Sequence, residues 1–89
     1  MERTPRQITA AAANLQRKLR KYWNQNIMTI TADVAPEGIH LQVTAADGAV
    51  LAEQTMDPNT GAWELYREGQ SLAGKAVSVA INNFLARTA

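Results

Sequence analysis

Three short segments between residues 28 and 56 alternate apolar and polar side chains, and this period of two is typical of half-buried β-strands. The segments cover residues 28–34, 39–46 and 49–56, and two turn sequences separate them. The first turn is Ala35-Pro36-Glu37-Gly38, in which proline fixes φ and glycine accepts a positive φ. The second is Asp47-Gly48, a favoured two-residue hairpin turn. We therefore expect an antiparallel meander with residues 39–46 as its central strand.

The two expected hairpins agree about which residues share a face of the sheet. The turns impose the pairs Val34–Ile39, Ile30–Val43, Val43–Ala52 and Ile39–Met56. All of these residues are apolar, and a slip of one residue in either hairpin would place some of them on the opposite face. In this register Val50 joins the apolar face, whereas Leu51 lies on the polar face.

Helical periodicity flanks the strands on both sides. Thr4-Pro5-Arg6-Gln7 has the pattern of a helix start with a capping box. Apolar residues then recur at helical spacing: Ile8, Ala11, Ala12, Leu15, Leu19 and Tyr22. A second helix is expected from Ser71, its predicted cap after a loop residue at Gly69. Its apolar stripe comprises Ala73, Ala76, Val77, Ala80 and Phe84. Residues 62–69 fit a strand, an early helical turn or a loop.

These elements predict an α+β domain with the order helix-strand-strand-strand-helix. The fold class is a two-layer sandwich in which the N-terminal and C-terminal helices cover one face of a three-stranded antiparallel meander. We expect residues 1–89 to form a single domain, because a chain of 89 residues supports one hydrophobic core. The chain has no Cys and no apolar run long enough to span a membrane, so we expect a cytoplasmic protein without membrane contact.

The order of elements, with Gly69 and Ser71 before an alanine-rich segment, resembles the double-stranded-RNA-binding domain over about two thirds of the chain. That family carries a run of lysines at the start of its last helix. Here the corresponding residues are Leu72-Ala73-Gly74-Lys75, and some fifteen residues separate the third strand from Ser71 where the family has only a few. The resemblance therefore implies the order of the elements and transfers no RNA-binding residue.

Two patterns that could carry catalysis lack essential parts. Residues 69–75 match G-x-x-x-x-G-K, but Ala76 follows where a phosphate-binding loop needs a hydroxyl group for Mg²⁺. The expected register also places Asp33, His40 and Thr55 in a row, on an open sheet face without a pocket that excludes water. One His and no Cys leave few ligands for a transition metal. We therefore expect no enzymatic activity, no cofactor and no metal site.

The charges divide the chain into two parts. Residues 1–26 carry a net charge of +5, and residues 27–89 carry −4. A basic helix side can contact phosphates, so nucleic-acid binding is the alternative function. Its candidate residues are Arg6, Arg17, Lys18, Arg20 and Lys21. A solvated helix face explains the same residues equally well.

A protein partner is the favoured interpretation, because a sequence pI near 8.2 is less basic than dedicated nucleic-acid binders usually are. The expected open sheet face also lacks aromatic side chains for base stacking, and aromatic residues are assigned to the core by default, with Trp63 and Tyr66 as exceptions. The candidate protein-binding residues are Thr29, Thr31, His40, Gln42, Leu51, Glu53, Trp63 and Tyr66. The edges of the first and third strands could also accept another chain or a second copy. The sequence predicts a small binding or regulatory protein and does not identify its partner.

Overall fold

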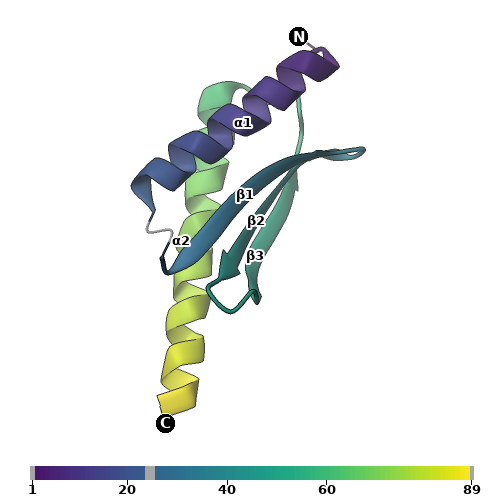
Figure 1. The fold of residues 1–89 in the computed structure, drawn as a ribbon. Coiled ribbons are helices and arrows are strands. Elements are labelled where there is room, and N and C mark those ends of the chain that lie inside the picture. The colour runs from purple at the N-terminus through teal and green to yellow at the C-terminus, as the bar shows by residue number, and fades with distance from the viewer. Residues whose placement is uncertain (1, 24–25, 89) are drawn as a thin grey trace.

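The computed structural model describes residues 2–23 and 26–88 (Figure 1). The elements are α1 (Pro5–Tyr22), β1 (Met28–Ala35), β2 (Gly38–Ala45), β3 (Val50–Met56) and α2 (Ala62–Thr88). The strands form one antiparallel sheet in the order β1-β2-β3. α1 packs mainly on β1, α2 packs on β3 and β2, and the two helices contact each other on the same side of the sheet. The predicted α+β fold class and element order are confirmed.

The start of α1 follows the predicted capping box. Thr4 Oγ1 accepts a hydrogen bond from the backbone N–H of Gln7 at 3.2 Å, and Gln7 Oε1 accepts one from the N–H of Thr4 at 2.9 Å. The neighbouring Arg3 fixes this end to the loop before α2. Its N–H donates to Asn59 Oδ1 at 2.7 Å, and its guanidinium donates to the carbonyls of Pro58 and Thr60. The beginnings of the two helices are thereby held together.

The first hairpin has the predicted register. Ile30 lies opposite Val43, and a two-residue loop connects the strands. Gly38, the first residue of β2, has a φ of +146°, a conformation that side chains rarely allow. A Cβ at this position would lie 2.3 Å from the carbonyl oxygen of Met56 in β3. Glycine is therefore required here both by the backbone conformation and by the closeness of the neighbouring strand.

The second hairpin has one more loop residue than predicted, and β3 has one extra residue at a bulge. Its loop has three residues rather than two, because the N–H of Ala45 donates to the carbonyl of Ala49 at 2.8 Å and the N–H of Gly48 donates to the carbonyl of Ala45 at 2.9 Å. Gly48 adopts a φ of +90°, as three-residue hairpin loops require. A β-bulge in the next part of the ladder restores the predicted pairing of Val43 with Ala52.

The bulge changes the faces of two residues. Val50 pairs with Thr44 on the open face and is 51% exposed, whereas Leu51 is 8% exposed and belongs to the core. The predicted positions of Val50 on the apolar face and Leu51 on the open face were both wrong. The longer loop shifts the pairing by one residue between the turn and the bulge, so a count of residues from the turn fails there. The extra residue of the bulge breaks the alternation of side chains and restores the predicted pairing beyond it.

α2 is one continuous helix from Ala62, so residues 62–69 are helical. Gly69 and Ser71 lie inside the helix, and the predictions of a loop at Gly69 and a cap at Ser71 were wrong. Gly69 is buried where α2 contacts α1: a Cβ there would lie 2.7 Å from Leu19 Cδ1. The glycine permits close approach of the helices, although it lowers local helix propensity.

The hydrophobic core lies between the sheet and the helices, and its largest fully buried side chains are Leu19, Ile30, Ile39, Leu41, Val43 and Leu65. The last turns of α2 extend beyond the ends of the strands (Figure 1). Tyr22 and Phe84 are each 64% exposed, so their assignment to the core was wrong. Trp63 is 68% exposed, as predicted, whereas Tyr66 is half-buried and packs against the core, so its prediction as an exception was wrong. Within residues 2–23 and 26–88, neither helix has the length and apolar character needed to cross a bilayer.

Candidate binding surfaces

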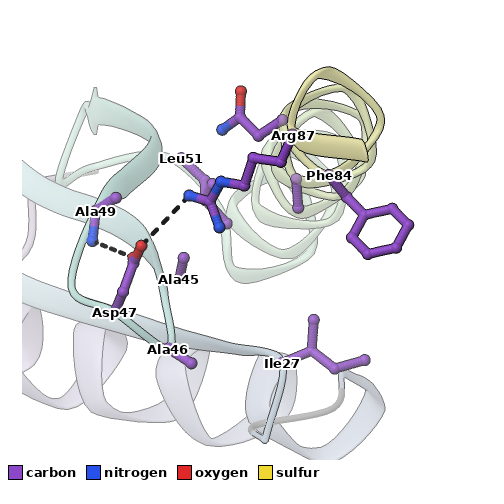
Figure 2. Close-up of a pocket in the computed structure, with 10 residues that line it drawn as sticks. Ile27, Ala45, Ala46, Asp47, Ala49, Leu51, Phe84 and Arg87 are labelled. Carbon is purple, nitrogen blue, oxygen red and sulfur yellow. Dashed lines mark hydrogen bonds and ion pairs between the residues drawn. The ribbon is translucent and has the colours of Figure 1, made fainter. Parts of the chain in front are cut away.

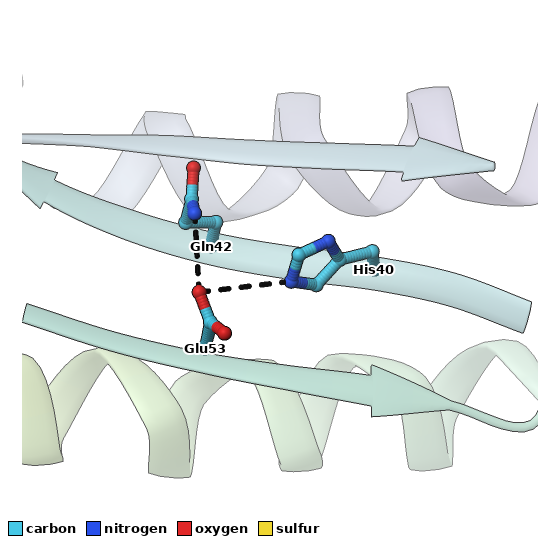
Figure 3. A network of polar contacts seen from close by, with 3 residues as sticks. All are labelled: His40, Gln42 and Glu53. Atoms are coloured by element: carbon cyan, nitrogen blue, oxygen red, sulfur yellow. Dashed lines mark hydrogen bonds and ion pairs between the residues drawn. The ribbon is translucent and has the colours of Figure 1, made fainter. Parts of the chain in front are cut away.

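The open face of the sheet carries five of the predicted protein-binding residues: Thr29, Thr31, His40, Gln42 and Glu53. Three of them form a polar network across β2 and β3 (Figure 3). Gln42 Nε2 donates to Glu53 Oε2 at 3.1 Å, and His40 Nε2 lies 3.9 Å from the same oxygen. These three side chains therefore interact with one another, and none of the five lines a main hollow in the described part of the chain.

The row of acid, base and hydroxyl groups has the predicted register. Asp33 lies opposite His40, and His40 lies opposite Thr55. His40 Nε2 nevertheless lies 3.9 Å from Glu53 Oε2, and Asp33 and Thr55 are exposed. The described residues include no group of three His, Asp or Glu side chains that could hold a metal ion.

Side chains of α1 lie along the edge of β1. Two side chains of α1 bind backbone groups of β1: Gln16 Oε1 accepts from the N–H of Ala32 at 3.0 Å, and Arg20 Nε donates to the carbonyl of Ile30 at 2.7 Å. Side chains that satisfy an edge reduce its ability to pair with another strand. The predicted use of the β1 edge is therefore partly obstructed, and Arg20 serves as a link between α1 and the sheet.

The remaining predicted residues form a site that combines the two sequence-based sets. Trp63 and Tyr66, predicted to bind protein, lie beside the end of α1 that carries the predicted phosphate-binding cations. Cations and aromatic residues from both helices line a hollow of about 300 Å³, which we call the basic–aromatic pocket. Its lining residues are Arg17, Lys18, Lys21, Tyr22, Trp63 and Tyr66. Arg6 lies in the first turn of α1 and does not line it. Tyr22 was missed because its spacing matched the core stripe, and the pocket could be found only once residues 62–69 were known to be helical.

A second hollow, of about 400 Å³, is lined entirely by apolar residues and was not predicted. We call it the α2 groove. Trp23, Ile27 and Met28 line one side of it, and Val77, Ala80, Ile81 and Phe84 of α2 line the other. One sequence feature accompanies it, since residues 76–86 contain no charged side chain. The prediction assigned Val77, Ala80 and Phe84 to one core-facing stripe; Val77 and Ala80 pack against the core, whereas Phe84 is 64% exposed.

A neighbouring hollow of about 270 Å³ shares Ile27, Ala80 and Phe84 with the α2 groove. Figure 2 shows Arg87 reaching from α2 to Asp47 in the second hairpin loop, with 3.6 Å between Arg87 Nη2 and Asp47 Oδ2. Asp47 Oδ1 also accepts a hydrogen bond from the N–H of Ala49 at 3.0 Å. This ion pair forms a polar rim beside the apolar surface.

Comparison with known proteins finds no matching family model, no matching curated protein and no matching solved structure.

Proposed function

We propose that this chain is a non-enzymatic binding protein that holds an apolar helical segment of a protein partner in the α2 groove. The observation that supports this most is the groove itself: a hollow of about 400 Å³ with apolar lining along the C-terminal half of α2. The proposed function of the chain is contact with another macromolecule, which is also the function that the sequence analysis favoured. The surface that supports it best is the groove and not the open sheet face.

Exposure of large apolar side chains around the groove supports a docking role. Ile27, Ile81, Phe84 and Leu85 are 61%, 52%, 64% and 56% exposed. Single exposed apolar residues are common on proteins, but contiguous apolar patches with a polar rim mark interaction sites. Burial of the exposed half of one such side chain contributes on the order of 1 kcal/mol, so the cluster offers a substantial driving force for association.

The shape and chemistry of the groove favour a helix as its occupant. The groove follows α2 from Val77 to Phe84, which is about two helical turns. No charged side chain lines it, so an inserted surface must itself be apolar. A helix with apolar residues at positions i, i+3 or i+4, and i+7 presents such a surface along a similar length. The partner is therefore expected to present an amphipathic helix.

The open sheet face is less suited to this role. Gln42, Glu53 and His40 already interact with one another, and a partner would have to replace those contacts. Interfaces gain most of their affinity from a few apolar or aromatic residues near the centre. The open face offers no large apolar side chain near its centre, because the bulge turns Leu51 into the core.

Site-specific photo-cross-linking in the source cell tests this proposal. A photoreactive phenylalanine analogue replaces Phe84 in one variant and Gln42 in the control variant. We expect an adduct from position 84 whose partner peptide has the apolar spacing of an amphipathic helix, and we expect the added substitution Ile81→Asp to abolish it. Adducts formed from position 42 alone would contradict the proposal. An adduct of twice the chain mass would replace it with self-association.

A further inference from the structure

The basic–aromatic pocket is separate from the α2 groove. The packing of α1 against α2 brings its lining residues together. Arg17, Lys18, Lys21 and Tyr22 belong to the last turns of α1, while Trp63 and Tyr66 belong to the first turns of α2. The close approach at Gly69 allows the helices to contact each other there. Arg3 holds the start of α1 to the loop before α2. The pocket is therefore positioned by the helix contact at Gly69 and by the hydrogen bonds of Arg3.

Tyr66 lies at the centre of the aromatic part of the pocket. Its ring centroid is 6.3 Å from that of Tyr22 in an edge-on arrangement and 6.0 Å from that of Trp63 in a tilted one. The hydroxyl of Tyr66 accepts a hydrogen bond from Gln70 Nε2, and Gln70 Oε1 accepts one from Trp23 Nε1 at 2.8 Å. These hydrogen bonds fix the half-buried Tyr66, while the other two rings remain mostly exposed.

The charged residues that line the pocket are all positive. Arg17, Lys18 and Lys21 line the pocket, and no carboxylate does. Lys21 Nζ lies 5.9 Å from the centroid of the Tyr22 ring. Among the described residues, the ion pairs join Glu64 to Arg67 and Asp47 to Arg87, and His40 lies near Glu53. The three cations of the pocket take part in none of these contacts. The pocket therefore attracts an anion.

From this juxtaposition we propose that the basic–aromatic pocket binds single-stranded nucleic acid, with its cations on the phosphates and the exposed rings of Trp63 and Tyr22 stacked on unpaired bases. Lysine and arginine side chains contact phosphates, and aromatic side chains stack on bases whatever their sequence. Paired bases inside a duplex do not offer their faces to such rings. An acidic peptide would use the cations and leave the aromatic rings without a stacked ligand. The expected ligand is therefore a single strand with little sequence preference.

The open sheet face has no aromatic residues, which argues against stacking of bases on that face. It does not argue against stacking elsewhere on the molecule. Stacking on the sheet is one arrangement for single strands, and here the rings lie between the helices instead. The pocket places only three cations close together, which suits a weak contact with a few nucleotides. Three phosphate contacts predict a slope of about −2 for log affinity against log salt concentration on a single strand.

Fluorescence anisotropy with a labelled oligothymidylate of about ten nucleotides tests the proposal. We expect Trp63→Ala to weaken binding about tenfold, with Trp63→Phe retaining most of the affinity because stacking persists. Lys18→Glu is expected to weaken binding strongly. Arg6→Glu is the matched control, since it makes the same change of charge on the same helix outside the pocket, and it should alter affinity by less than about twofold. Unchanged circular dichroism and melting temperature would show that the variants remain folded.

Three results would overturn the proposal. The first is absence of oligothymidylate binding at low salt. The second is equal or tighter binding of a duplex together with no effect of Trp63→Ala, which would indicate phosphate contacts alone. The third is displacement of the oligonucleotide by polyglutamate at the same charge concentration, which would indicate an acidic protein as the ligand. The test is independent of the α2 groove, because Ile81→Asp should leave oligonucleotide affinity unchanged.

Discussion

Gly69 of α2 lies against Leu19 of α1 so closely that a Cβ on the glycine would come within 2.7 Å of Leu19 Cδ1. Leu19 is fully buried and cannot easily move away. The two helices therefore approach each other closely at this point. The basic–aromatic pocket is formed by the first turns of α2, before Gly69, and the α2 groove by turns that follow it.

The contact predicts opposite effects for two glycines of the same helix. Gly74→Ala should raise the free energy of unfolding by about 0.5–1 kcal/mol, because alanine favours the helix and a Cβ there meets nothing within 4 Å. Gly69→Ala should lower it by about 1 kcal/mol or more, because overpacking against Leu19 outweighs the same gain. Urea denaturation of both variants measures the difference. Equal stabilisation by both would show that the helices do not approach closely at Gly69.

The bulge in β3 predicts unequal effects for two neighbouring residues. Leu51→Ala should cost about 2–4 kcal/mol, because it leaves a cavity in the core. Val50→Ala should cost less than about 1 kcal/mol, since Val50 is half exposed on the open face. Chemical denaturation compares the two variants. The reverse order would restore the simple alternation that the two-residue turn implied.

Sequence reasoning found the parts of the fold in which several local constraints agree. The capping box fixed the start of α1, and the register of β1, β2 and most of β3 followed because each pair had to place apolar residues on one face. The loop of the second hairpin was predicted one residue too short. Asp47-Gly48 is compatible with two loop lengths, and the bulge hid the difference by restoring the pairing at Val43.

The candidate sites were harder to predict, because they depend on how separate elements lie against each other. Spacing along α1 grouped Arg17, Lys18 and Lys21 but could not show that Trp63 lies beside them. Helical spacing also assigned Tyr22 of α1 and Phe84 of α2 to the core, although both are exposed. Periodicity gives the face of a helix on which a residue lies and not the point where the neighbouring element ends. The last turns of α2 extend beyond the ends of the strands. This could be predicted only if the lengths of both the strands and the helix were known.

The centre of the sheet gives a prediction about the apolar face. Val43 is fully buried in the middle strand, so Val43→Asp should place a charge in the core and unfold the domain. Thr29→Asp is the control, because Thr29 is exposed on the other face of the sheet. Circular dichroism and thermal melting report both variants. A Val43→Asp variant that melts near the wild-type temperature would contradict the assignment of the faces.

The central claim is that a protein partner binds the α2 groove and not the open sheet face. The measurement that tests it most directly is the affinity of the cross-linked partner segment, prepared as a peptide, for two variants of the whole chain. Ile81→Asp places a charge in the groove, and Gln42→Arg places a bulky charge on the open sheet. We predict that Ile81→Asp weakens binding by about tenfold or more, while Gln42→Arg leaves it unchanged. Loss of binding with Gln42→Arg and full affinity with Ile81→Asp would contradict the account.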